Sequence, residues 1–318
     1  MRIGIVITRA ANVEPTWTTA HIACALLAAG HDVRFIEGFD FEVDAASRVV
    51  CRTHAFDPPG PDRAGLCRAL RERTAPRRYL ELAKLDLLLL RINPMDTAVL
   101  TFASLAERLG VTVLNSPTTI LRTSHKGYVS TLVGVPRPRT MVSRSRSALH
   151  AFAVEMSEGA VVKPARSSGG KGIFHVGRGQ YAELDRAIDQ ARKQGDGYVV
   201  VQEYLPAAER GEKRLVWLDG ELLGGYLRQR APGEFRHNLK RGGRPESCEI
   251  TAQDRTLIET LTPTLRADGV WLAGIDVIGD KVVEVNTLNP GGLHLIQLFA
   301  GRDLTQPIVL GLESKKLS

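Results

Sequence analysis

The segment Gly274–Gly292, GIDVIGDKVVEVNTLNPGG, predicts an antiparallel β-hairpin, and its side-chain pattern fixes the register. Gly279-Asp280 marks a turn between two short apolar runs. A two-residue loop would place polar and apolar side chains together on both faces of the hairpin. A three-residue loop pairs Asp276 with Glu284 and separates the two classes, so we expect this register. Because side chains alternate between faces, a slip of one residue would exchange the faces.

Three oxygen-bearing side chains, Asp276, Glu284 and Asn286, then share one face of this hairpin. Two adjacent carboxylates and an amide oxygen repel one another unless a cation lies between them, and hard oxygen ligands suit Mg²⁺. An edge hairpin whose polar face meets solvent explains the same pattern equally well. This segment alone therefore leaves two interpretations open, a metal site and a solvated face.

The composition is that of an ordinary globular protein, with 43% hydrophobic and 24% charged residues among 318. The net charge of +7 and the pI near 9.4 are compatible with nucleic-acid binding. However, the arginines are scattered along the chain and aromatic residues make up only 6%, so stacking platforms are scarce. A basic pocket for small anions, or general surface charge, explains the excess as well. We therefore expect no nucleic-acid partner.

Cysteine usage and hydropathy indicate the compartment. The four cysteines show neither a CxxC pair nor metal-ligand spacing, which fits a reducing cytosol, so we expect a cytoplasmic protein. The opening MRIGIVITRA indicates a first strand rather than a signal peptide. No segment approaches the roughly 20 apolar residues that a membrane span needs, so we expect no membrane association.

The first third of the chain alternates predicted strands and helices, the pattern of an α/β unit. Its run LDLLLLR is apolar throughout, as in a buried parallel strand. No GxGxxG follows the first strand, which argues against dinucleotide binding. The segment 38–76 contains a proline-rich stretch and yields no assignment. The expected elements are strands at 2–8, 31–36, 85–91 and 111–116, and helices at 16–29 and 96–109.

A junction is expected at residues 121–127, and the elements beyond it suggest a small α+β module. Helices are predicted at 145–158 and 181–194, and strands at 160–165 and 198–204. In the last third, Asp219-Gly220 predicts a hairpin turn. Thr251 followed by Asp254 three residues later predicts a helix that begins with a capping box and ends near Gly269.

The motif VVKPARSSGGKGIF, residues 161–174, predicts a strand that delivers Lys163 and a loop of small residues after it. Glycine permits positive φ and close approach, so the backbone N–H groups of such a loop can fold over phosphate oxygens. It is not a Walker A sequence, since the GK[ST] ending before a helix is absent. A glycine-rich hairpin tip is more often only a turn, and Lys163 on the preceding strand favours phosphate.

Two further motifs carry polar groups with alternative roles. In VVVQEYLP, residues 199–206, the end of a strand can read an adenine edge through its backbone, and Glu212 would then be placed for a ribose hydroxyl. A strand end with surface salt bridges is the alternative. In YLRQRAPGEFRHNLKRGG, residues 226–243, Arg228, Arg236 and Asn238 suit planar anions such as carboxylate and phosphate. A solvated basic loop is equally compatible with that segment.

Taken in order, these motifs resemble the ATP-grasp superfamily, and most closely bacterial glutathione synthetase. The resemblance covers nearly the whole chain. Each motif is weak by itself, but the ordered set is specific, and it favours the metal interpretation of the hairpin. The matching segments are NSP at 115–117, KP at 163–164, the GG loop, EYLP, GEKRLVWLDGE at 211–221, RHNLKRGG, and GIDVIGDKVVEVN.

The resemblance implies an α/β and α+β protein with the ATP-grasp fold and an N-terminal Rossmann-like (pre-ATP-grasp) domain. It implies an N-terminal domain at 1–122, a small lid subdomain at 123–204 and a core subdomain at 205–318. It also implies ATP with two Mg²⁺ ions, with Mn²⁺ as a substitute, and a homodimer or homotetramer. The implied roles are phosphate contacts from Lys126 and Lys163; loop closure by Ser168, Gly169 and Gly170; adenine contacts from Glu203 and Tyr204; a ribose contact from Glu212; metal ligation by Asp276, Glu284 and Asn286; and catalysis by Arg228 and Asn238.

The implied reaction joins a small-molecule carboxylate to an amine through an acyl phosphate, with γ-glutamylcysteine and glycine as the family's pair. Four departures put that pair in doubt: TLNPGGL at 287–293 in place of a pattern like TSPTCIRE, His237, Ser167, and Asn93-Pro94. A ribosomal-protein-type glutamate ligase or a natural-product tailoring ligase is the alternative. A non-catalytic ATP-binding module is a further alternative, which the intact metal triad and both lysines oppose.

Overall fold

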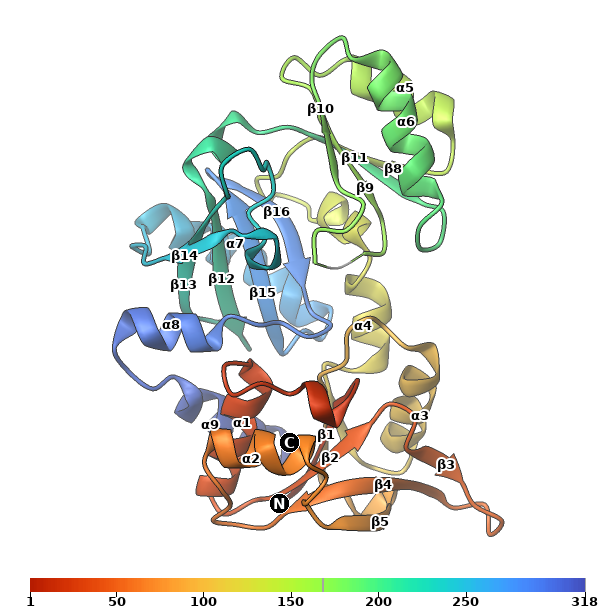
Figure 1. Ribbon diagram of the computed structural model, residues 1–318, viewed down its shortest axis with the longest axis vertical. Coiled ribbons are helices and arrows are strands. Elements are labelled where there is room, and N and C mark those ends of the chain that lie inside the picture. The colour runs from red at the N-terminus through yellow and green to blue at the C-terminus, as the bar shows by residue number, and fades with distance from the viewer. Residues whose placement is uncertain (168, 318) are drawn as a thin grey trace. The chain divides into compact units, whose positions relative to one another are not determined.

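The computed structural model describes residues 1–167 and 169–317, and the chain forms two compact units (Figure 1). Unit 1 contains residues 1–120, 269–272 and 287–318, and unit 2 contains residues 121–268 and 273–286. The chain therefore passes from unit 1 into unit 2 near residue 121, returns at 269–272, enters unit 2 again at 273 and leaves it at 287. The first of these crossings lies at the junction predicted at 121–127.

Unit 1 is built on a seven-stranded mixed sheet in the order β3-β4-β2-β1-β6-β7, with β5 paired to β4. The central strands are parallel, since β1 pairs with β2 and β6, and β6 pairs with β7, in that sense. The strand β4 is antiparallel to β2, β3 and β5. The strands are β1 (Arg2–Ile7), β2 (Asp32–Glu37), β3 (Phe41–Val43), β4 (Val49–Phe56), β5 (Arg77–Glu81), β6 (Leu87–Leu90) and β7 (Thr112–Leu114).

Helices connect the strands of this sheet, and side-chain caps fix where two of the helices begin. Asp62 accepts a hydrogen bond from the Gly65 amide at the start of α2, and Asp96 accepts from Ala98 and Val99 at the start of α3. The helical elements of unit 1 are η1 (Ala10–Asn12), α1 (Thr18–Ala28), α2 (Arg63–Arg71), η2 (Leu82–Lys84), α3 (Thr97–Arg108), α4 (Pro117–Thr123), which runs into unit 2, α8 (Leu293–Ala300) and α9 (Thr305–Leu317).

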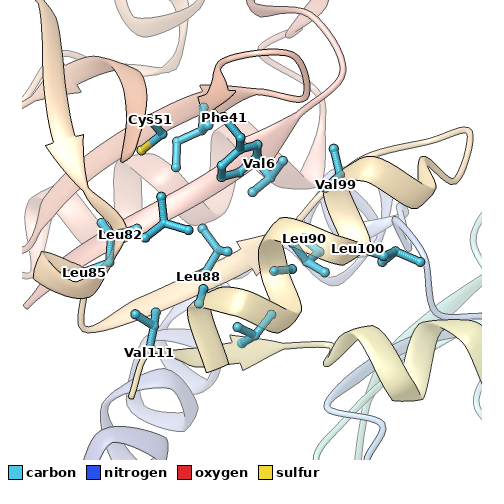
Figure 2. Close-up of a cluster of buried hydrophobic side chains, with 14 of the residues drawn as sticks. Val6, Phe41, Cys51, Leu82, Leu85, Leu88, Leu90, Val99, Leu100 and Val111 are labelled. Carbon is cyan, nitrogen blue, oxygen red and sulfur yellow. The ribbon is translucent and has the colours of Figure 1, made fainter. Parts of the chain in front are cut away.

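A buried apolar cluster joins α3 to one face of the sheet of unit 1 (Figure 2). The run LDLLLLR supplies β6, and all four strand residues are buried, as predicted for a central parallel strand. Residues 38–76, which the sequence left unassigned, contain β3, β4 and α2. The eight-residue strand β4 lacks a clean alternation because six of its residues are buried, so a period-two pattern could not identify it.

Unit 2 contains two sheets. The four-stranded sheet has the order β10-β9-β11-β8 and packs on α5 and α6 through an apolar core. The predicted elements of this α+β module are thus confirmed, with shorter bounds. Its elements are η3 (Lys126–Thr131), β8 (Thr140–Ser143), α5 (Arg146–Val154), β9 (Ala160–Pro164), β10 (Phe174–Val176), α6 (Tyr181–Arg192) and β11 (Val199–Glu203).

The five-stranded sheet of unit 2 has the order β14-β13-β12-β15-β16. The predicted capping box is confirmed at the start of α7, where Thr251 and Asp254 exchange side-chain and backbone hydrogen bonds. The elements are η4 (Pro206–Arg210), β12 (Glu212–Leu218), β13 (Glu221–Gln229), η5 (Leu239–Arg241), β14 (Arg244–Glu246), α7 (Ala252–Ala267), β15 (Leu272–Ile278) and β16 (Lys281–Asn286). No helix of the described residues is long and apolar enough to cross a membrane.

The hairpin β15–β16 has the predicted pairing but a different turn. Asp276 lies opposite Glu284, as expected. The predicted three-residue loop is wrong, because Ile278 pairs with Lys281 and leaves a two-residue turn. The extra residue is accommodated by an irregularity next to Val283, which restores the register before Glu284. A bulge and a longer loop shift the register equally, so the face pattern alone cannot distinguish them.

Candidate active site

One face of the five-stranded sheet gathers charged side chains from four adjacent strands. On β12, Glu212 and Arg214 are two residues apart and so share a face. Arg228 on β13 pairs directly with Glu212. Asp276 on β15 and Glu284 on β16 form the next direct pair. The intervening Lys213 projects to the other face, where it binds Asp254 of α7. Strand alternation therefore separates the charged site from the packing against α7.

Asp276 is buried, with only 4% of its surface exposed, and two arginines bind its carboxylate. Arg214 donates from Nε to Oδ1 and from Nη2 to Oδ2, the latter over 2.9 Å, and Arg228 Nη2 lies 2.6 Å from Oδ1. Burial by itself would raise the pKa of Asp276, but the charges of Arg214 and Arg228 outweigh it and hold that pKa at about 2. Asp276 is therefore a carboxylate throughout the physiological range.

Glu284 meets a second pair of cations. Lys126 Nζ lies 2.8 Å from Glu284 Oε1 and also donates to the Ser167 carbonyl over 2.9 Å. Burial opposes ionisation of Glu284, but Lys126 and Lys163 outweigh it and lower its pKa. Lys126 is predicted from the sequence as a phosphate contact, and the structure brings it to the predicted metal ligand.

Lys163 lies on β9 of the four-stranded sheet and is only 5% exposed. Its ammonium group donates to Gln202 Oε1 on β11 over 3.0 Å. Burial lowers the pKa of Lys163 to about 8, although the charge of Glu284 acts in the opposite direction. A buried ammonium with a neutral amide partner is costly in the absence of an anion, which suits a site that receives phosphate.

The glycine loop after β9 meets the RHN segment that follows β13. Gly169 and Gly170 have φ of 67° and 71°, values that favour glycine. Arg236 Nη1 donates to the Gly170 carbonyl over 3.0 Å, and a Cβ added at Gly170 would lie 3.6 Å from Asn238 Cβ. The structure thus brings the predicted phosphate loop against Asn238. Ser168, predicted to belong to this loop, lies outside the described residues.

The predicted adenine and ribose contacts have partners in unit 2. The Glu203 carboxylate accepts from the Arg139 amide over 3.1 Å and lies 3.6 Å from Lys281 Nζ. Alternation along β11 points Glu203 away from the face of Gln202 and Lys163, so a ligand on that face would meet the Glu203 backbone. Tyr204 stacks on His175 with ring centroids 4.1 Å apart. These adenine contacts stay predictions.

Glu212, Arg228 and His237 form a connected group. Arg228 Nη2 contacts Glu212 Oε1, and His237 Nδ1 lies 3.9 Å from Glu212 Oε2. His237 Nε2 lies 2.8 Å from the Ala208 carbonyl, and burial lowers the pKa of this imidazole. Arg228 Nε is buried without a hydrogen-bond partner among the described residues. The ribose role of Glu212 and the catalytic roles of Arg228 and Asn238 stay predictions.

The donor set fits magnesium when a ligand completes it. Among the described residues, no cluster of three or more His, Cys, Asp or Glu side chains could hold a metal ion. Asp276 and Glu284 supply two carboxylates, and Asn286, which donates through Nδ2 to Asp276 Oδ2 over 3.1 Å, adds an amide oxygen. Mg²⁺ is commonly bound by one or two carboxylates plus the phosphates of a substrate. Four cations facing three carboxylates leave positive charge for such phosphates.

Sequence reasoning missed the contacts of Arg214 and Gln202 with the candidate site residues, and also those of the buried Asn115 with the two ends of the β15–β16 hairpin. Arg214 could have been found, because it lies two positions after Glu212 on a predicted strand. Gln202 carries no signal before the pairing of β11 with β9 is known, since only that register places it beside Lys163. Asn115 stands in the NSP motif, but its partners are more than 150 positions away.

Comparison with known proteins identifies the family. Residues 128–301 match the model of the family described as prokaryotic glutathione synthetase, ATP-grasp domain. The chain belongs to this family. It is 37% identical over 224 residues to the glutathione synthetase of Thermosynechococcus vestitus, covering 70% of each protein. It is 29% identical over 329 residues to that of Coxiella burnetii, covering 99% of this chain and 97% of that protein.

Solved structures show the same fold. The chain superposes on a D-cycloserine synthetase with a TM-score of 0.67 at 15% identity, covering 99% of each chain. It superposes on the D-Ala:D-Ser ligase of Enterococcus faecalis with a TM-score of 0.65 at 16% identity, covering 98% of this chain and 94% of that one. The predicted ATP-grasp fold is thus confirmed. As a member of this family, the protein is a ligase that forms amide bonds and uses ATP and a divalent metal.

Proposed function

We propose that this ligase joins a carboxylate substrate to an amine through an acyl phosphate, and that γ-glutamylcysteine and glycine are the first pair to test. The observation that carries this proposal is the cluster in which Lys126, Lys163, Arg214 and Arg228 surround the carboxylates Asp276 and Glu284. Its surplus positive charge suits a nucleotide triphosphate. The relatives are glutathione synthetases, so the precursors of glutathione are the pair to test first.

In the proposed reaction, an oxygen of the substrate carboxylate attacks the γ-phosphorus of ATP, and the bond to the bridging oxygen breaks to release ADP. The amine then attacks the acyl carbon, loses a proton, and displaces phosphate as the amide forms. Lys126 and Lys163 would hold phosphate oxygens, and Arg228 would neutralise charge that develops on the transferring group. A bound Mg²⁺ would add further neutralisation. Catalysis is then mostly positioning and electrostatics, because the protein supplies no nucleophile.

The remaining contacts follow from the same placement. The glycine loop, Ser168 to Gly170, would cover the phosphates, and Asn238 would donate to the reacting group. The backbone of Glu203 and the ring of Tyr204 would line the adenine site, with Glu212 at the ribose. We propose two Mg²⁺ ions bound by Asp276, Glu284 and Asn286, with Mn²⁺ as a working substitute.

The segment that follows the proposed metal ligands favours a substrate pair other than γ-glutamylcysteine and glycine. Its sequence is TLNPGGL, which has no arginine, and its conformation is tied to unit 1 by Arg91, whose Nη2 donates to the Pro290 carbonyl over 2.9 Å. His237 is buried beside Glu212 and adds bulk next to the proposed ribose site. A ligase of this fold that takes another acid or amine would carry such changes.

The proposal also includes a domain organisation, an oligomeric state and a cellular location. We propose that residues 1–122, 123–204 and 205–318 act as the N-terminal domain, the lid and the core, and that the protein assembles as a homodimer or homotetramer. We further propose that it acts in the cytoplasm and has no nucleic-acid partner. All four cysteines are free, which agrees with a reducing compartment.

The deciding experiment is ATP- and metal-dependent phosphate release with mass detection of the product. With γ-glutamylcysteine and glycine together, we expect phosphate and glutathione in equal amounts. Glu284→Gln, which removes a predicted metal ligand, serves as the inactive control. Silence with this pair but release with another acid and amine would replace the substrate assignment and keep the ligase chemistry. Release that does not require an amine, or that persists in Glu284→Gln, would contradict the mechanism.

A further inference from the structure

Asn115 follows β7 in unit 1 and is 5% exposed. Its Oδ1 accepts hydrogen bonds from the amides of Trp271 and Leu272 over 2.7 and 3.1 Å. Its Nδ2 donates to the carbonyls of Leu272 and Thr287 over 3.0 and 2.8 Å. An amide side chain has two donor hydrogens and one acceptor oxygen with two lone pairs, so this asparagine uses its full capacity on backbone groups.

These backbone groups are the two open ends of the hairpin β15–β16. Leu272 is the first residue of β15, and Thr287 directly follows the last residue of β16. The same two residues are the last of unit 1 before the chain enters unit 2 and the first after it returns. The hairpin between them carries all three predicted metal ligands. One side chain therefore ties both ends of the segment on which the metal site is built.

The hairpin needs such a tie because its turn alone does not determine where Glu284 lies. The two-residue turn would by regular pairing oppose Asp276 with Val283, and the irregularity next to Val283 shifts the register by one. With the extra residue, Glu284 and Asn286 lie on the same face as Asp276. Without it, other side chains of β16 would take their place on that face. Fixing the Leu272 and Thr287 carbonyls at the open end selects the register in which Asp276 opposes Glu284.

We propose that Asn115 is a positioning residue for the metal site: by holding both ends of the β15–β16 hairpin, it sets the register that brings Asp276, Glu284 and Asn286 together. This inference rests on the proposed role of those three side chains as metal ligands. Asn115 itself contacts only backbone groups of unit 1, so it acts through the hairpin.

The test uses Asn115→Asp, which keeps the shape of the side chain. It replaces Nδ2 with an oxygen that cannot donate to the Leu272 and Thr287 carbonyls. The probe is Mn²⁺ bound to the full-length protein in the presence of ADP, followed by electron paramagnetic resonance. We expect Mn²⁺ affinity to fall about tenfold or more, as for other groups that orient metal ligands. ADP affinity without metal should change less than about twofold, since the hairpin ligands meet the nucleotide through the metal.

A matched control is Asp62→Ala, which removes the side-chain bond to the Gly65 amide at the start of α2 in the same unit. It should lower the unfolding temperature and leave Mn²⁺ affinity unchanged. If Asn115→Asp also lowers only the unfolding temperature, the residue is merely structural and the inference is wrong. Glu284→Gln separates the two proposals. If it leaves Mn²⁺ affinity unchanged, the proposed metal site itself fails.

A measurement on the unaltered protein covers the case in which Asn115→Asp does not fold. Backbone amide exchange at Leu272, which donates to Asn115, should slow when Mn²⁺ and ADP bind. The amide of Val33, in β2 of the unit 1 sheet, should not respond. An unchanged exchange rate at Leu272 would show that the tie and the metal site are independent, and would overturn the inference.

Discussion

At the scale of single residues, the proposed phosphate contact of the buried Lys163 should make nucleotide use sensitive to alkaline pH. Burial lowers its pKa to about 8, so in the free protein the ammonium loses its proton as the pH rises past that value. A neutral amine holds phosphate poorly. We therefore expect kcat/KM for ATP to fall above about pH 8, because kcat/KM reports ionisations of the free enzyme. The measurement is phosphate release between pH 6.5 and 9.5.

Lys163→Arg is the control for this titration, because a guanidinium stays charged over the whole range. Its kcat/KM should be lower overall, since the side chain differs in shape, but it should show no alkaline decline near pH 8. The same decline in the arginine variant would assign the titration to another group. For folding, the trend is opposite: a lysine whose pKa is lowered in the native state destabilises the protein at low pH, and this cost is relieved as the pH rises from about 8 to the ordinary pKa of 10.5.

The side chain of Arg214 passes close to Gly274 where it binds Asp276, so we predict that this position must be glycine. A Cβ at this position would lie 2.9 Å from Arg214 Nη1, so Gly274→Ala should displace the guanidinium from the carboxylate. We expect kcat/KM to fall about 10- to 100-fold and stability to fall as well, because the buried Asp276 would lose one of the two arginines that compensate its burial. Gly311→Ala, where the nearest atom is at 3.7 Å, is the control and should keep full activity. Equal activity in both variants would remove Arg214 from the site.

At the scale of elements, the pairing of β9 with β10 depends on Gly159. This residue has φ of 84°, and a Cβ there would lie 2.3 Å from the Val176 carbonyl oxygen. Gly179→Ala is a matched control, because Gly179 has φ of 80° and open space around it. The control should lose about 1–3 kcal/mol from backbone strain alone, and Gly159→Ala should lose more in urea unfolding. Equal losses would show that β10 moves away without cost.

At the scale of the whole molecule, buried histidines make the fold sensitive to acid. Burial lowers the pKa of His21 to about 4 and also lowers those of His54 and His237. As pH falls below about 6.5, the unfolded chain binds protons that the native protein does not, so the free energy of unfolding should fall between pH 6.5 and 4. Urea unfolding at pH 7.5 and 5.0 measures this loss, and His21→Gln should reduce it. Stability that is constant over this range would contradict the prediction.

Much of the fold and half of the site follow from local pattern. The apolar run that forms β6, the capping box of α7 and the face shared by Asp276 and Glu284 depend on periodicities of two and 3.6 that neighbouring residues display. The strand β4 escaped prediction because it is buried on both faces and so lacks alternation. The turn of the hairpin was predicted wrongly, because a longer loop and a bulge place the same side chains on the same face.

The sequence by itself determined which side chains are candidates for the site: two carboxylates and an amide on one hairpin, a lysine before a glycine loop, and Arg228, Arg236 and Asn238 in one basic segment. Tertiary structure alone decided which of them meet. The pairing of Lys126 with Glu284, of Arg214 with Asp276, and of Asn115 with Leu272 and Thr287 joins residues separated by 62 to 172 positions. No local pattern encodes such contacts, because they are set by strand order and register, which depend on the packing of the whole sheet.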